Sequence, residues 1–319
     1  MSRRARAVPA PCPRHAAPPH VAEMSGVAEL GFRTTPRPRR PDAGPVRCRS
    51  GTRGAAVRFS VLGTLEARDD DGAVELSPKL RDLLALLLCA PNAAVGTERL
   101  VDGLWGEAAP RSARTTLRGY ASHLRRALGE ERLTFRSGGY VLLVQDGELD
   151  AARFTDLAGT GRRALAAGDH ERGAALLREA AALWRGVPFD GQDHLAAVRR
   201  EAVRLGELRL AATEARIDAD LALGRHADLV GELRCVVVDD PFRERPRAQL
   251  MLALYRLGRA AEALEVLRET RALFAAELGL DVSPSLRALE RAILSHHPAL
   301  NLGHGLGHGL ALSPAPGTR

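Results

Sequence analysis

The chain is poor in lysine, in aromatic residues and in long apolar runs. Lys79 is the one lysine among 46 basic residues in a sequence of 319, so an arginine-rich segment is a weaker sign of nucleic-acid binding here than in an average protein. Aromatic residues make up 4% of the chain, and abundant alanine and leucine favour helices over sheets. No run reaches the roughly 18 apolar residues of a membrane span, and the N-terminus lacks the apolar core of a signal peptide. We therefore expect a cytoplasmic protein without membrane contact.

Motifs for catalysis and for metal binding are also missing. The four cysteines form no CxxC pair, which argues against a zinc site. The sequence contains no GxxxxGK(S/T), HExxH or GxSxG motif, and no GxGxxG that follows a strand. Four histidines occur in the glycine-rich stretch SHHPALNLGHGLGHGL, and we interpret residues 299–319 as a flexible tail rather than a metal site. We expect no enzymatic activity, no cofactor and no metal.

The positive charge is unevenly distributed. Residues 1–56 carry 11 arginines against three acidic residues and are rich in proline, alanine and glycine, which predicts a disordered basic tail. Alternatively, translation begins downstream, at Met24 or near Val57. Between residues 108 and 145, seven arginines stand against Glu130 and Glu131, a net charge of +5. The folded part therefore has a basic patch of its own.

Residues 57–146 predict a winged helix-turn-helix. The predicted elements are, in order, a strand over 57–67, an acidic hairpin turn at 69–72, helices that begin after Ser77, Thr97 and Pro110, and a hairpin turn at 137–139. The third of these helices ends at Gly129, the usual place for a C-terminal glycine. In a winged helix-turn-helix the third helix enters the major groove of DNA.

The third helix has one apolar and one cationic face. At about 100° per residue, its inward stripe consists of Ala113, Leu117, Tyr120, Ala121, Leu124 and Leu128. The neighbouring face carries Arg111, Arg114, Arg118 and Arg125, with Thr115 and Ser122 beside them. Arg132 and Arg136 extend the positive charge to the predicted wing. The basic face therefore coincides with the recognition position of the fold.

Residues 150–298 predict helical repeats. LGRHADLVGELR, from Leu223, recurs as LGRAAEALEVLR, from Leu257, at an offset of 34 residues, which is the tetratricopeptide period. A long helix over roughly 193–223 separates this pair from an earlier, diverged one, and a generic helical bundle is the alternative. We interpret Trp184 and Phe189 as core anchors; the alternative is that they line an interface or an effector pocket. The predicted fold class is mostly α, with a winged helix-turn-helix (α+β) before an all-α tetratricopeptide-like domain.

The chain resembles the Streptomyces antibiotic regulatory protein family, in which a winged helix precedes a bacterial transcriptional activation domain. The resemblance covers about three quarters of the chain, and the stretches that carry it include FSVLGTLEA, ERLVDGLWG, ARTTLRGYASHLRRALG, ALWRGVPF and RAQLMLALYRLGRAAEALEVLRETRALFAAELGLDVSPSLRALERAIL. Within it, the positions that match the family's recognition-helix pattern are Arg114, Thr116, Ser122, Arg125 and Arg126. Three positions depart from that pattern, namely Thr115, Arg118 and Gly119. We also expect Pro246 to delay the start of the helix that includes Leu250 and Leu254.

The resemblance implies an activator of secondary-metabolite (antibiotic) genes that binds direct repeats in double-stranded DNA near promoters and contacts RNA polymerase. We expect it to self-associate on DNA and to lie on the nucleoid. Arg114 and Arg118 are the expected base readers, with Thr115 contacting a thymine methyl group or a phosphate. The expected phosphate ligands are Arg111, Arg125, Arg126, Arg132 and Arg136. The alternative is a helical-repeat adaptor whose winged helix binds protein rather than DNA.

Overall fold

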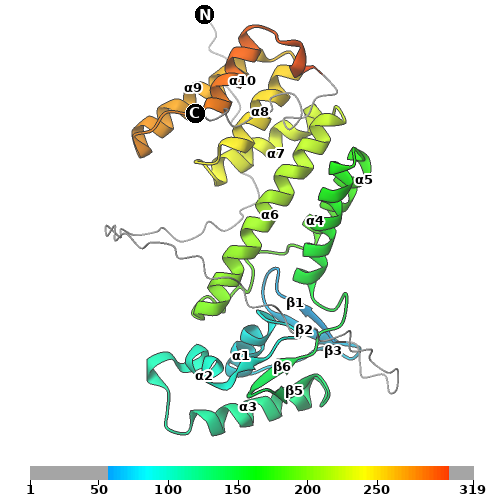
Figure 1. Cartoon of the computed structure of the whole chain (residues 1–319), viewed down its shortest axis with the longest axis vertical. Coiled ribbons are helices and arrows are strands. Elements are labelled where there is room, and N and C mark those ends of the chain that lie inside the picture. The colour runs from blue at the N-terminus through cyan, green and yellow to red at the C-terminus, as the bar shows by residue number, and fades with distance from the viewer. Residues whose placement is uncertain (1–56, 302–319) are drawn as a thin grey trace, which may run out of the picture.

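The structure, a computed structural model, describes residues 57–301. The predicted basic tail, 1–56, and residues 302–319 of the predicted C-terminal tail lie outside this range. Figure 1 shows an elongated arrangement, in which the small sheets and helices α1 to α3 occupy one end and helices α7 to α10 the other. The long helix α6 runs between the two ends, beside α4 and α5.

The N-terminal end has the predicted winged-helix order. Its elements are β1 (Arg58–Ser60), β2 (Glu66–Asp69), β3 (Gly72–Ala73), α1 (Pro78–Leu88), β4 (Val95–Gly96), α2 (Thr97–Trp105), the short 3-10 helix η1 (Gly106–Ala108), α3 (Ala113–Leu128), β5 (Leu133–Arg136) and β6 (Gly139–Leu142). Two antiparallel sheets form, in the orders β1-β2-β3 and β4-β6-β5. Strand β4 was not predicted. It lies so close to β6 that a Cβ on Gly139 would fall 2.5 Å from the carbonyl oxygen of Val95.

The predicted single strand over 57–67 is wrong, because it breaks after Ser60. The amides of Val61 and Leu62 donate to the carboxylate of Asp150 at 2.8 to 3.1 Å instead of pairing with a strand. The carbonyl oxygens of the same two residues accept from the amides of Phe189 at 2.8 Å and Arg185 at 2.7 Å. The chain between β1 and β2 is therefore bonded to the helical part of the molecule.

The helical part confirms the predicted repeats. Its elements are α4 (Asp150–Ala166), α5 (His170–Ala182), α6 (Ala196–Ala222), α7 (His226–Asp239), α8 (Glu244–Arg256), α9 (Ala260–Leu278), α10 (Pro284–Leu294) and the 3-10 helix η2 (Pro298–Leu300). Gly168, Gly224 and Gly258 adopt φ values of 83°, 81° and 76° in the turns before α5, α7 and α9. Such left-handed positions favour glycine. The pairs α4–α5, α6–α7 and α8–α9 are therefore joined by turns of the same kind.

Two smaller expectations in this part of the chain need revision. Helix α8 begins at Glu244, so Pro246 lies in its first turn and does not delay the helix start. Proline is tolerated there because the first amides of a helix have no intrahelical partner. At the C-terminal end Leu300 is buried, and its carbonyl oxygen accepts from Nε of Arg256 at 2.7 Å. The packed helical region therefore extends to Leu300.

The hydrophobic core divides within α6 and not between the winged helix and the first repeat helices. One cluster of buried side chains includes Phe59 of β1, Leu117 of α3, Phe154 of α4 and Leu205 of α6. The second begins at Ile217, also in α6, and continues through α7, α8, α9 and α10. The winged helix therefore shares one core with α4, α5 and the first half of α6.

Trp184 and Phe189 belong to the first core, as predicted. Phe189 is 2% exposed, and Trp184 packs edge-to-face on Phe154 with ring centroids 5.3 Å apart. Arg209 of α6 lies over the Trp184 ring, with its guanidinium carbon 4.7 Å from the centroid. A cation over an aromatic face adds to this packing.

Between residues 57 and 301, no helix combines the length and the hydropathy that crossing a membrane requires.

Candidate nucleic-acid interface

Helix α3 is anchored by its apolar stripe, which determines the face that it presents to solvent. Leu117, Ala121 and Leu124 are 0% exposed and pack among α1, α2 and the wing. Tyr120, which is half-buried, stacks on Trp105 of α2 with ring centroids 6.0 Å apart. The orientation of the opposite face therefore follows from the 3.6-residue period of the helix.

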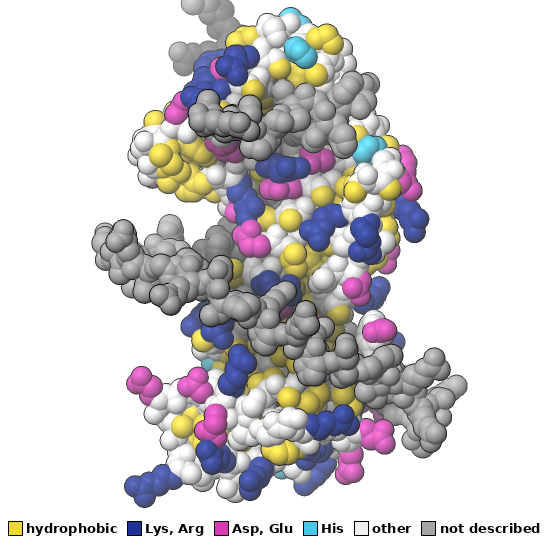
Figure 2. All heavy atoms as spheres, in the orientation of Figure 1, with side chains coloured by type: hydrophobic (Ala, Val, Ile, Leu, Met, Phe, Trp, Pro, Cys, Tyr) yellow, Lys and Arg dark blue, Asp and Glu magenta, His cyan; other side chains and the backbone are white. Residues whose placement is uncertain are grey.

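The face of α3 opposite the core is cationic. The exposed side chains on and just before this helix that were predicted to contact DNA are Arg111, Arg114, Thr115, Arg118 and Arg126. Thr116 and Ser122 are half-buried at its edges. In the part of the chain that the structure describes, Arg111, Arg118 and Arg126 form no ion pair with an acidic side chain. Figure 2 shows arginine and lysine side chains along the edge of the molecule where α3 lies in Figure 1.

Arg114 has an acidic neighbour that the sequence did not reveal. Its Nη2 lies 2.8 Å from Oε1 of Glu98, in the first turn of α2. Both side chains are about 70% exposed, at 70% for Arg114 and 69% for Glu98. The only sequence signal was an acidic residue in the first turn of the preceding helix, which is common at helix N-termini whatever their function.

Arg125 joins α3 to the wing. Its Nε donates to the carbonyl oxygen of Leu133 at 2.7 Å, and its guanidinium carbon lies 6.0 Å from the centre of the Tyr140 ring. The side chain is half-buried. One donor of Arg125 is therefore used within the protein, and any contact with a phosphate has to come from its remaining donors.

The predicted phosphate contact of Arg132 is wrong. Arg132 is 8% exposed, and its Nη1 and Nη2 donate to the two carboxylate oxygens of Glu148 at 2.6 and 2.7 Å. Glu148 also accepts from the backbone amide of Gln145 at 2.7 Å. Arg132 is a structural residue that ties the base of the wing to the segment leading into α4. Arg136, at the other end of β5, is exposed beside the wing turn as predicted.

The comparisons with known proteins agree with this architecture. Residues 149–294 match the family described as bacterial transcriptional activator domain, and residues 71–142 match transcriptional regulatory protein, C terminal. The regulatory protein DnrI of Streptomyces peucetius is 35% identical over 257 residues, which cover 77% of this chain and 94% of DnrI. This chain belongs to the Streptomyces antibiotic regulatory protein family. The predicted family is confirmed.

Other relatives are longer than this chain. The regulatory protein AfsR of Streptomyces coelicolor is 45% identical over 247 residues, and the chain spans about a quarter of its length, 25%. A structure of Mycobacterium tuberculosis EmbR in complex with a low affinity phosphopeptide aligns with a TM-score of 0.74 at 33% identity, over 76% of this chain and 66% of that one. The names of these relatives describe regulatory proteins, and the predicted fold class is confirmed.

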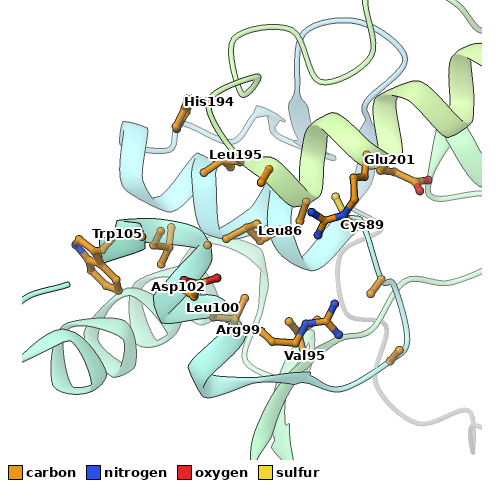
Figure 3. Close-up of a pocket in the computed structure, with 18 of the residues that line it drawn as sticks. Leu86, Cys89, Val95, Arg99, Leu100, Asp102, Trp105, His194, Leu195 and Glu201 are labelled. Carbon is orange, nitrogen blue, oxygen red and sulfur yellow. The ribbon is translucent and has the colours of Figure 1, made fainter. Parts of the chain in front are cut away.

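A cleft of about 890 Å³ lies between α1, α2 and the beginning of α6. Figure 3 shows Trp105 toward one end of it and Cys89 and Glu201 toward the other, with Arg99 on the α2 side. Burial, together with the nearby carboxylate of Glu201, raises the pKa of the Cys89 thiol to about 12. Since the thiolate is the reactive form of cysteine, Cys89 is held in its unreactive thiol form.

Cys89 should therefore resist alkylation in the folded protein. At pH 8 the raised pKa lowers its thiolate fraction roughly a thousandfold relative to a solvated cysteine. We expect iodoacetamide to modify Cys89 far more slowly in the native chain than in urea, as measured by mass spectrometry of the peptide that contains it. Equal rates in the two conditions would show that the cleft does not bury this thiol.

Proposed function

We propose that this protein is a sequence-specific DNA-binding transcriptional activator of secondary-metabolite genes, with α3 inserted in the major groove. The observation that carries the proposal is the cationic face of α3, which lies beside the buried stripe and contains arginines that have no acidic partner within residues 57–301. Membership of a family of antibiotic regulators supports it. An adaptor that bound protein through its winged helix would not need this face.

The exposed residues have different roles in this proposal. Arg118 and Arg114 read base edges, because a guanidinium matches the O6 and N7 acceptors of guanine. Thr115 contacts a thymine methyl group or a phosphate, and Thr116 and Ser122 border the reading face. Arg111, Arg126 and Arg136 neutralise phosphates, while Arg125 mainly holds the wing against α3.

The shared core gives the helical part a role in assembly. Because the winged helix shares one core with α4, α5 and the first half of α6, these helices keep a fixed direction relative to the bound DNA. Two chains on direct repeats about one helical turn apart would then present the same face. We propose that the surface of the helical repeats mediates self-association and contact with RNA polymerase. The protein acts in the cytoplasm, on the nucleoid.

Selection of binding sites from a randomised DNA pool by the full chain tests the proposal. The selected sites should contain a direct repeat, and affinity should fall steeply with salt. Arg118→Ala should cost about 1–3 kcal/mol on the selected site and relax one base pair, whereas Arg126→Ala should weaken all sequences alike and flatten the salt slope by about one.

A matched control separates local from general effects of charge. Arg291→Ala removes an exposed arginine from α10, at the other end of the molecule, and should leave DNA binding unchanged. If the wild-type chain binds every sequence equally, or if Arg118→Ala and Arg291→Ala behave alike, the recognition role of α3 is refuted. The adaptor function then becomes the better account.

A further inference from the structure

The ion pair between Glu98 and Arg114 lies at the edge of the reading face. The two residues are in the first turns of α2 and α3, and the connection between these helices brings them to 2.8 Å. Both side chains are mostly exposed, and exposed ion pairs contribute little to the stability of a fold. The pair can therefore be altered with little effect on folding.

We propose that Glu98 is a positioning residue that holds the Arg114 guanidinium in the orientation that reads a base. This role rests on the proposed function. Reading guanine requires two parallel N–H donors in one plane, and a free arginine side chain samples many planes. Nη2 of Arg114 carries two hydrogens, one parallel to a hydrogen of Nη1 and one parallel to the hydrogen of Nε. Glu98 lies 2.8 Å from Nη2 and covers one of these two donor forks, which leaves the other fork for DNA. Fixing the plane in the free protein reduces the ordering cost of binding.

The position of Glu98 makes this role distinguishable from a simple charge effect. A carboxylate beside the DNA repels phosphates, so electrostatics alone predicts that its removal strengthens binding to every sequence. Positioning predicts that its removal lowers the preference for the selected site over random DNA. The two accounts therefore differ in their effect on the ratio of the two affinities.

The experiment measures this ratio for the full chain and for Glu98→Ala, Glu98→Gln, Arg114→Ala and the double variant Glu98→Ala with Arg114→Ala. We expect Glu98→Ala to lower the ratio about two- to tenfold, the effect of disordering one long side chain. Glu98→Gln should keep part of it, because its amide oxygen can accept a hydrogen bond from Arg114. In the Arg114→Ala background, removal of Glu98 should no longer lower the ratio.

The control is Glu265→Ala on α9, which breaks the exposed ion pair between Glu265 and Arg268, whose atoms lie 2.7 Å apart. Like Glu98→Ala it removes one negative charge, but far from α3 (Figure 1). It should leave the ratio unchanged. The role of Glu98 alone is overturned if Glu98→Ala raises affinity for all DNA by one factor, or lowers the ratio equally with and without Arg114. A wild-type chain without sequence preference overturns the proposed function and this role together, and that result is seen before any variant is made.

Discussion

Replacing Arg132 with alanine is expected to destabilise the protein by about 3–5 kcal/mol, the usual cost of removing one partner from a buried ion pair. Glu148 would keep a buried carboxylate that has lost both guanidinium donors and retains the amide of Gln145. The loss should appear as a lower midpoint of urea unfolding, followed by circular dichroism of the full chain. The wing and α4 should still unfold together, because their buried side chains belong to one hydrophobic core.

Arg136→Ala is the matched control for this prediction. Arg136 lies at the exposed end of β5, four residues beyond Arg132, so its loss should change stability by less than about 0.5 kcal/mol while weakening DNA binding. Replacing Arg132 and Glu148 together with apolar residues should restore much of the stability. An Arg132→Ala protein as stable as the wild type, but weak on DNA, would reinstate the phosphate role.

The parts of the site that the sequence predicted depend on local patterns. The apolar period of α3 identified Leu117, Ala121 and Leu124 as its buried side, and all three are fully buried. Glycine marked the end of the same helix, where Gly129 has a φ of 101°. Helical spacing and helix ends depend on residues a few positions apart, so they can be inferred from a single chain.

The parts that were not predicted depend on partners distant in sequence. Arg132 was assigned to DNA because its partner Glu148 lies 16 residues away, beyond the wing hairpin. The break after Ser60 depends on Asp150, about ninety residues further on, which accepts from the amides of Val61 and Leu62. No periodicity records such contacts. Residue type alone also could not separate arginines that stay exposed from those that pair.

The ion pairs of the arginines decide which part of this arginine-rich chain is informative about binding. In the helical part many arginines are matched with acids, as in Arg243 with Glu207 and Arg271 with Glu290, while scattered ones such as Arg172 and Arg291 form no ion pair in the described residues. On α3, by contrast, Arg111, Arg118 and Arg126 form no ion pair in the described residues. In a chain that uses arginine in place of lysine, arginines are therefore informative about binding where the fold gathers several of them on one face without acidic partners.

The second large effect is expected for Asp220→Ala, at the boundary between the two cores. Asp220 is 3% exposed and accepts from Arg178 of α5 at 2.5 Å, Arg216 of α6 at 2.9 Å and Arg225 before α7 at 2.8 Å. Its removal leaves three guanidinium groups close together without their shared carboxylate. Arg216 is itself buried, so we expect a loss of about 3–5 kcal/mol in the free energy of unfolding.

The loss should appear first in helices α7 to α10, because these helices have a core separate from that of the winged helix. Hydrogen exchange should show their amides opening before those of α1 to α5, and the DNA affinity of the folded variant should stay within about twofold of the wild type. Asp228→Ala, an exposed change in α7, is the control and should cost less than about 0.5 kcal/mol. If Asp220→Ala unfolds in one transition with all amides opening together, α6 couples the two cores through its backbone and apolar contacts rather than through this carboxylate.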